Sequence, residues 1–121
     1  MNSTVITNAK IVNEGKLVEG DVLIRGNRIE KIGGRLSSGN TDNIVDAKGQ
    51  FLFPGAIDDQ VHFREPGLTH KATIYTEAKA AVAGGVTSFM EMPNTVPPVF
   101  TQSLLEDKYK IAARTSLANY S

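Results

Sequence analysis

The residues best suited to chemistry lie in the segment IDDQVHFREPG, at positions 57–67. Polar and apolar residues alternate through its middle, which predicts a strand with two differently solvated faces, and a Pro-Gly pair ends the pattern. Gln60, His62 and Arg64 would share one of these faces. An imidazole is a good ligand for zinc, and a guanidinium suits bidentate capture of a carboxylate. His62 therefore has two interpretations, a metal ligand or a hydrogen-bonded side chain that caps a strand.

A second polar position follows the next apolar strand, in the stretch MPNT at positions 92–95. Its Asn94 offers two donors and an acceptor. Ligand sites in α/β folds gather at the carboxyl ends of parallel strands, so Asn94 is expected near Arg64 if the two strands are neighbours. Two converging donors would suit an anionic or carboxylate-bearing small molecule. The alternative for Asn94 is ordinary turn chemistry beside a proline.

The remaining polar residues of this region are weaker candidates. His70 lies before a predicted helix without a partner at metal-ligand spacing, so we expect it to be solvated. Asp59 would point to the face opposite His62, because strand neighbours alternate. Zinc usually takes four donors, so a site built on His62 needs ligands from elsewhere.

Composition narrows the function classes. The 121 residues include 13 Lys plus Arg and 13 Asp plus Glu, a formal net charge of zero. A nucleic-acid binder would normally concentrate positive charge, so no nucleic-acid partner is expected. The absence of cysteine excludes disulfides and thiolate metal sites and fits a reducing compartment. No segment resembles a signal peptide or a membrane helix, so a soluble cytoplasmic protein is expected.

Residues 1–54 have the pattern of short strands separated by turn residues. The clearest is a hairpin over residues 21–33, where Gly26-Asn27 suits a tight turn. Further short strands are expected at residues 5–6, 10–12, 44–45 and 51–53, with a polar loop at 37–40. This segment is predicted to be a small β-sheet or β-sandwich without an active site of its own.

Residues 55–121 change to alternating strands and helices. Strands are expected at 57–62, 86–92 and 117–120, with a first helix over 72–83 and a second that begins after an N-cap at Thr101. The apolar face of the first helix is predicted to hold Ile74, Ala78, Ala81 and Val82. The stripe of the second is predicted to hold Leu104, Leu105, Tyr109, Ile111 and Ala112.

This order predicts a parallel sheet that helices cover. A complete (β/α)₈ barrel takes about 250 residues. The fold class is therefore α/β, the N-terminal part of such a barrel: two βα units and the start of a third strand, preceded by the β-sandwich segment. Two parallel strands and a short third would leave edges and apolar faces open. The chain is therefore expected to need the rest of the barrel, or self-association, for stability.

An ordered set of motifs runs through essentially the whole chain. They include DAKG at 46–49, FPGAID at 53–58, HFREPG at 62–67, AAVAGGVT at 80–87 and MPNT at 92–95. In order and spacing they resemble the N-terminal part of a dihydroorotase of the longer, bacterial cyclic-amidohydrolase type. The combination of Arg64 with Asn94 favours dihydroorotase over the related hydantoinases and allantoinases.

The resemblance implies a metal-dependent hydrolase that interconverts N-carbamoyl-L-aspartate and L-dihydroorotate in pyrimidine biosynthesis. It implies a (β/α)₈ barrel beside a small β-sandwich built from both chain ends, with one or two zinc ions as cofactor. His62 would match the second histidine of the family's His-x-His metal pair. Arg64 and Asn94 would match the residues that hold the substrate carboxylate.

Two departures from the family pattern are expected to matter. Gln60 stands where the first metal-binding histidine would be, and its amide oxygen is a weaker donor. Three possibilities stay open: a one-metal enzyme, a metal site of altered affinity, and an inactive homologue. The bridging lysine and the general base are expected beyond Ser121, so this chain alone is predicted to be inactive. The alternatives are a non-catalytic structural or assembly partner and a hydrolase of another cyclic ureide.

Overall fold

The computed structural model describes residues 2–36 and 43–121, and the polar loop predicted at 37–40 lies outside them. The chain divides into two compact units, Met1–Pro54 and Gly55–Ser121. The division falls where the run of short strands gives way to alternating strands and helices.

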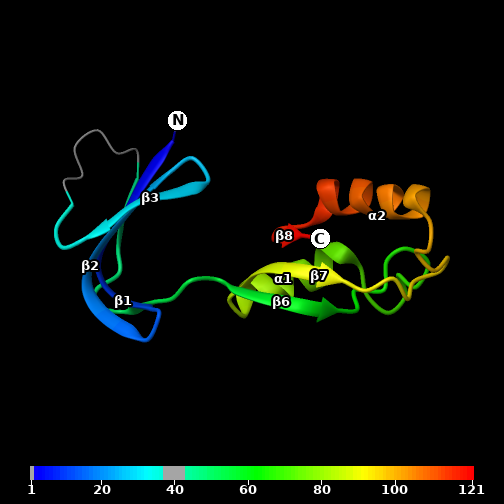
Figure 1. Ribbon diagram of the computed structural model, residues 1–121, viewed down its shortest axis with the longest axis horizontal. Helices are drawn as coiled ribbons and strands as arrows, with labels where there is room; N and C mark the ends of the chain where they lie inside the picture. Colours follow the sequence, from blue (N-terminus) through cyan, green and yellow to red (C-terminus); the bar gives the residue numbers. More distant parts are fainter. Residues whose placement is uncertain (1, 37–42) are drawn as a thin grey trace. The chain divides into compact units, whose positions relative to one another are not determined.

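The first unit is one five-stranded mixed sheet (Figure 1). Its strands are β1 (Ser3–Asn13), β2 (Lys16–Arg25), β3 (Arg28–Gly33), β4 (Asn43–Asp46) and β5 (Phe51–Leu52). β1 pairs antiparallel with β2 and parallel with β4 and β5, while β3 pairs with the far side of β2. The predicted β2–β3 hairpin is confirmed, with Gly26 at a φ of 59° in its turn.

The two short strands expected within residues 5–12 are one long strand, so that prediction was wrong. β1 stays continuous because Asn8, at a φ of 56°, absorbs a register shift between Ile6 and Ala9. The Asn8 backbone N–H donates to Asp21 Oδ1 at 3.0 Å, and its side-chain amide donates to Asp46 Oδ1 at 2.9 Å. The latter hydrogen bond is the main reason why the pKa of Asp46 lies below its usual value.

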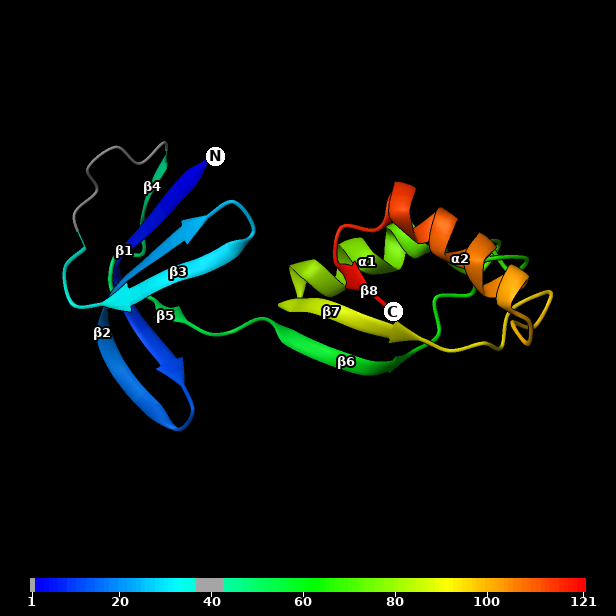
Figure 2. The ribbon, with the colours of Figure 1, turned by 45° about the horizontal axis from the view of Figure 1, so that its top comes forward.

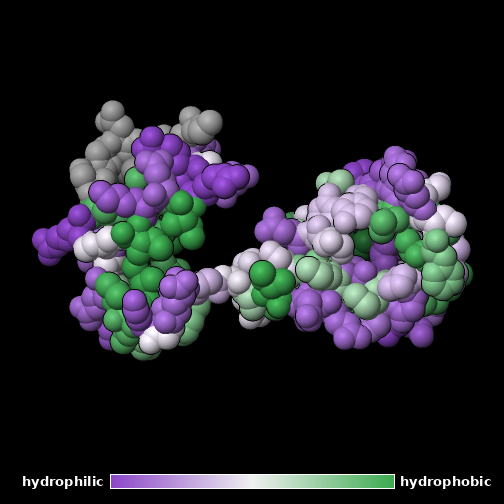
Figure 3. Space-filling view, in the orientation of Figure 1, coloured by the Kyte–Doolittle hydropathy of each residue, from purple (hydrophilic) through white to green (hydrophobic). Residues whose placement is uncertain are grey.

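A β-sandwich needs two packed sheets, and the described residues of the first unit supply one. Its small core contains Ala9, Ile11 and Val22. Many large apolar side chains on this unit are exposed, and Figure 3 shows hydrophobic residues at its surface. They are Leu17, Val18, Ile29, Ile32, Ile44, Val45, Phe51 and Phe53. This sheet is therefore one layer with apolar surface left uncovered.

The second unit has the predicted βαβαβ order, with strands β6 (Ala56–Val61), β7 (Val86–Glu91) and β8 (Asn119–Tyr120). They form a parallel sheet in the order β6-β7-β8. Figure 2 shows α1 (Ile74–Ala83) and α2 (Gln102–Thr115) together on one face of this sheet. The core between the layers is built from Val61, Phe63, Ile74, Ala78, Phe89 and Ala112.

A threonine caps the N-terminus of each helix. Thr73 forms a capping box with Thr76, and Thr101 accepts a hydrogen bond from the N–H of Leu104, as predicted for that N-cap. None of the helices in the two described ranges is long and apolar enough to cross a membrane.

The apolar faces of the helices are narrower than predicted. On α1, Ile74 and Ala78 are buried, whereas Val82 is 41% exposed and lies at the margin of the stripe. On α2, Leu105 is 46% and Tyr109 39% exposed. The centre of the buried face of α2 is instead occupied by a charged residue, Lys108, one turn before Ala112.

Candidate functional site

The carboxyl ends of β6 and β7 bring the candidate residues together. The last hydrogen bond between the two strands runs from the Met92 N–H to the Val61 carbonyl, at 3.0 Å. Val61 and Phe63 are buried against the helices, and the Phe63 ring lies 4.5 Å from that of Phe89. His62, between them, is exposed. Alternation thus directs His62 away from the helix-covered face of the sheet.

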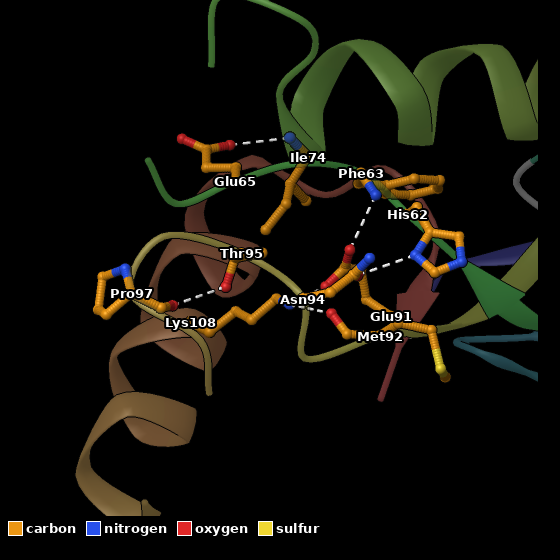
Figure 4. Close-up of polar contacts among 10 residues, drawn as sticks. All are labelled: His62, Phe63, Glu65, Ile74, Glu91, Met92, Asn94, Thr95, Pro97 and Lys108. Carbon is orange, nitrogen blue, oxygen red and sulfur yellow. Dashed lines mark hydrogen bonds and ion pairs between the residues drawn. The ribbon is translucent and has the colours of Figure 1, made fainter. Parts of the chain in front are cut away.

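His62 is oriented by Asn94. The ring Nδ1 lies 2.9 Å from Asn94 Oδ1, as Figure 4 shows. With the amide oxygen facing the ring, Nδ1 carries the hydrogen and donates, which leaves the lone pair on Nε2. Metal-binding histidines are held in the same way, because the partner fixes both tautomer and ring direction. Asn94, expected to act beside Arg64, is thus also a partner of His62.

Arg64 does not continue the strand. β6 ends at Val61, and Arg64 has a φ of 69°, so the alternation that would place it on the face of His62 no longer applies. Its carbonyl accepts a hydrogen bond from the Leu68 N–H at 3.0 Å. Within residues 2–36 and 43–121, its guanidinium has no hydrogen-bond or ion-pair partner and does not bond to Asn94. Arg64 therefore begins the turn after β6 with its charge available.

Gln60 and His70 lie apart from this contact. Gln60 is exposed on β6, and its N–H donates to Asp58 Oδ1 at 3.1 Å, where the pairing of β6 with β7 is irregular. His70 is exposed in the loop before α1. Among the described residues, no three His, Cys, Asp or Glu side chains cluster closely enough to hold a metal ion. His62 thus fits one metal ligand, and no contact joins the Gln60 side chain to it among the described residues.

The loops that follow β6 and β7 are joined through their backbones. The Val96 N–H donates to the Pro66 carbonyl at 3.2 Å. Gly67 has a φ of 83°, and a Cβ there would overlap the Val96 carbonyl. Glu65 Oε2 accepts from the Ile74 N–H at 2.8 Å, which ties the first loop to the start of α1. The turn after Arg64 is therefore held by the loop after β7 and by the start of α1.

Gly67→Ala is expected to lower the free energy of unfolding by about 2–4 kcal/mol, because both the positive φ and the contact with Val96 oppose a Cβ. The matched control is Gly85→Ala, where φ is 90° and a Cβ would meet nothing within 4 Å, so only the backbone cost of about 1 kcal/mol applies. Denaturant unfolding of the two variants measures the difference. Equal losses would contradict the close approach of the two loops.

The sequence interpretation missed two residues beneath the site, Glu91 and Lys108. Their carboxylate and ammonium form an ion pair, and the side chains are only 5% and 8% exposed. Burial lowers the pKa of Lys108 to about 8. A signal was present, because Lys108 stands midway between Leu104 and Ala112 at a spacing of four, in the middle of an apolar stripe.

Comparison with known proteins identifies the family. A family model described as dihydro-orotase-like matches residues 49–121, more than half of the chain. The chain belongs to the dihydro-orotase-like family. Among curated members, the chain is similar to the dihydroorotase of Methanosarcina acetivorans, at 37% identity over 95% of the chain and 25% of that protein. It is also similar to the dihydroorotase of a Wolbachia strain from Drosophila simulans, at 45% identity over 93% of the chain and 26% of that protein.

Solved structures place this dihydro-orotase-like chain among mixed α/β amidohydrolases. The L-hydantoinase (dihydropyrimidinase) of Arthrobacter aurescens superposes with a TM-score of 0.93 and 26% identity, over 100% of this chain and 27% of that one. A D-hydantoinase superposes with a TM-score of 0.83 and 27% identity, over 98% of this chain and 26% of that one. The chain spans about a quarter of the length of the curated relatives it matches.

Proposed function

We propose that this chain is the N-terminal part of a dihydroorotase, a cyclic amidohydrolase that interconverts N-carbamoyl-L-aspartate and L-dihydroorotate in pyrimidine biosynthesis. The observation that carries the proposal is the hydrogen bond between His62 and Asn94 at the ends of β6 and β7. Arg64 follows in the turn after β6, and its guanidinium has no hydrogen-bond or ion-pair partner among the described residues. The named dihydroorotases among its relatives support the same reaction.

Each residue has a role that its side-chain chemistry supports. Arg64 binds the substrate carboxylate, for which a guanidinium offers paired donors. Asn94 accepts from His62 through Oδ1, so its NH₂ group remains to donate to the same carboxylate. His62 would hold a divalent metal through Nε2, and Gln60 would be a weaker second donor. A bound zinc ion supplies Lewis-acid polarisation of the amide carbonyl.

The rest of the site lies outside this chain in our proposal. The second unit would open a (β/α)₈ barrel, whose later strands supply the other ligands and the general base, and the first unit would be one layer of a β-sandwich. The uncovered apolar side chains of the first unit support a second layer. This chain alone would then be inactive, and would need the remaining barrel or self-association for stability. A cytoplasmic location stays a prediction from the lack of cysteine.

The activity is tested with the full-length protein that carries this chain. Purified protein is given N-carbamoyl-L-aspartate or L-dihydroorotate in one series and hydantoin, which lacks the carboxylate, in another. Turnover of the carboxylate-bearing pair with little or none of hydantoin is expected, because Arg64 and Asn94 are assigned to that carboxylate. Preference for hydantoin would overturn the proposal in favour of another cyclic-ureide hydrolase.

Gln60→His is expected to tighten metal binding by about tenfold or more, because an imidazole replaces a weak amide donor beside His62. The matched control is Asp59→His, which adds the same side chain at the neighbouring position of the same strand. Competition with a metal-binding dye measures both affinities. Equal affinities in the two variants would contradict a place for residue 60 at the metal.

Gln60 also favours a second candidate function, that of a non-catalytic structural or assembly partner. Absence of both metal binding and turnover, in the natural protein and in Gln60→His alike, would favour this partner and exclude the enzyme.

A further inference from the structure

The peptide groups on both sides of His62 are held by residues at the end of β7. The backbone ladder ends where the Met92 N–H meets the Val61 carbonyl. Just past the end of β6, the next N–H on the side of β7 is that of Phe63. It donates to a side chain instead of a backbone carbonyl, Glu91 Oε1 at 2.8 Å (Figure 4). Glu91 thus continues the cross-strand bonding past the end of the ladder, and His62 lies between two fixed peptide groups.

The same carboxylate is tied to the Asn94 side of the site. Glu91 pairs with Lys108 of α2, and Lys108 Nζ also donates to the Met92 carbonyl at 2.8 Å. The Met92 carbonyl lies in the chain just before Pro93 and Asn94, and the restricted φ of proline limits the freedom of the intervening link. One buried ion pair therefore reaches both the backbone next to His62 and the backbone that leads to Asn94.

We propose that Glu91 is a positioning residue of the site, with Lys108 as the buried counter-charge of its carboxylate. Glu91 fixes the backbone beside His62, and with it the direction of the ring, its contact with Asn94 and its free Nε2. Glu91 need not touch the substrate. The kinetic consequence rests on the proposed function, whereas the orientation of His62 does not.

A purely structural pair would fasten α2 to the sheet without affecting His62, and two double variants separate the roles. Glu91→Gln with Lys108→Met keeps an oxygen that can accept from the Phe63 N–H and leaves no buried charge. Glu91→Met with Lys108→Met is equally neutral but has no acceptor. The control is Lys110→Met on the exposed side of α2, where the lysine pairs only with surface carboxylates.

The experiment uses the full-length protein with ¹⁵N-labelled histidine and asparagine. It records the ring signals of His62, the side-chain amide signals of Asn94, and kcat and KM for N-carbamoyl-L-aspartate. The Glu91→Gln double variant is expected to keep both sets of signals and a kcat/KM within about threefold of the natural value. The Glu91→Met double variant should shift the signals and lose about 30-fold to 100-fold, as expected for misplaced groups. Lys110→Met should change nothing.

The two double variants must differ for the proposal to stand. If both keep the His62 signals, or both lose them equally, the positioning role is overturned. If the Glu91→Met variant does not fold, Glu91→Asp replaces it, since the shorter carboxylate withdraws from Phe63 and should move the His62 signals; unmoved signals then overturn the proposal. If the natural protein lacks turnover, the proposed function fails. The His62 and Asn94 signals then decide by themselves whether the positioning role stands.

Discussion

Lys108→Met is expected to lower the free energy of unfolding by roughly 3–5 kcal/mol, because it leaves the buried carboxylate of Glu91 without a counter-charge. The side chain of Glu91 is only 5% exposed, so water cannot compensate for the lost ammonium. Denaturant unfolding of the full-length protein measures the loss. Lys110→Met on the same helix, which breaks only exposed ion pairs, should cost less than about 1 kcal/mol.

Restoring the charge balance should recover much of this loss. With Glu91→Gln added to Lys108→Met, no buried charge remains, and neutral replacements of buried ion pairs are often well tolerated. A double variant as unstable as the single one would contradict the charge explanation and indicate that the lysine matters through its packing.

The stability difference should also depend on pH. Burial lowers the pKa of Lys108 from 10.5 to about 8 in the folded protein, so the unfolded chain binds more protons between these values. This titration alone makes the free energy of unfolding rise with pH through that interval, and the rise is absent from Lys108→Met. Subtracting the curve of the variant from that of the natural protein isolates it. A flat difference between pH 8 and 10.5 would contradict the lowered pKa.

Arg64→Met is expected to lower kcat/KM for N-carbamoyl-L-aspartate by about 10²–10⁴-fold. Hydrogen bonds to charged groups contribute about 1.5–3 kcal/mol each, and a guanidinium can make two to one carboxylate. Arg64→Lys should lose less, since it keeps the charge but not the paired geometry. Steady-state kinetics in both directions measures the effect.

The control for this loss is Arg114→Met, an exposed arginine in the last turn of α2 that should leave the kinetics unchanged. A normal kcat/KM in Arg64→Met would remove Arg64 from the substrate site. It would also remove the reason for preferring a carboxylate-bearing substrate.

The order of strands and helices in the second unit could be predicted from the sequence, because periodicity and local end signals mark its elements. Thr101 caps α2, and Gly84 and Gly85 end α1, as the sequence predicts. Strand order followed from the βαβαβ pattern, since parallel neighbours need helical connections. In the first unit, residues 5–6 and 10–12 were predicted as separate strands, because the partners that hold the intervening Asn8, Asp21 and Asp46, are distant in sequence.

The candidate site was predicted from residue types at the ends of two strands, but its contacts were not. The prediction placed Asn94 near Arg64, whereas the structure brings Asn94 to His62. Their direct hydrogen bond could not be predicted, because it depends on the path of the backbone beyond the last hydrogen bond between β6 and β7. The φ of 69° at Arg64 has the same origin, a tertiary constraint without a signal in strand periodicity. Glu91 and Lys108 were overlooked because charged residues are usually placed at the surface.

The backbone contact between Gly67 and Val96 has a consequence for attempts to change substrate range. The loop after β6 approaches the loop after β7 so closely at Gly67 that a Cβ there would overlap Val96, and the two backbones are hydrogen-bonded beside it. Segments transplanted from a hydantoinase should therefore be exchanged as a matched pair. A chimera whose foreign loop places a side chain at residue 67 would clash with Val96, whatever its specificity residues.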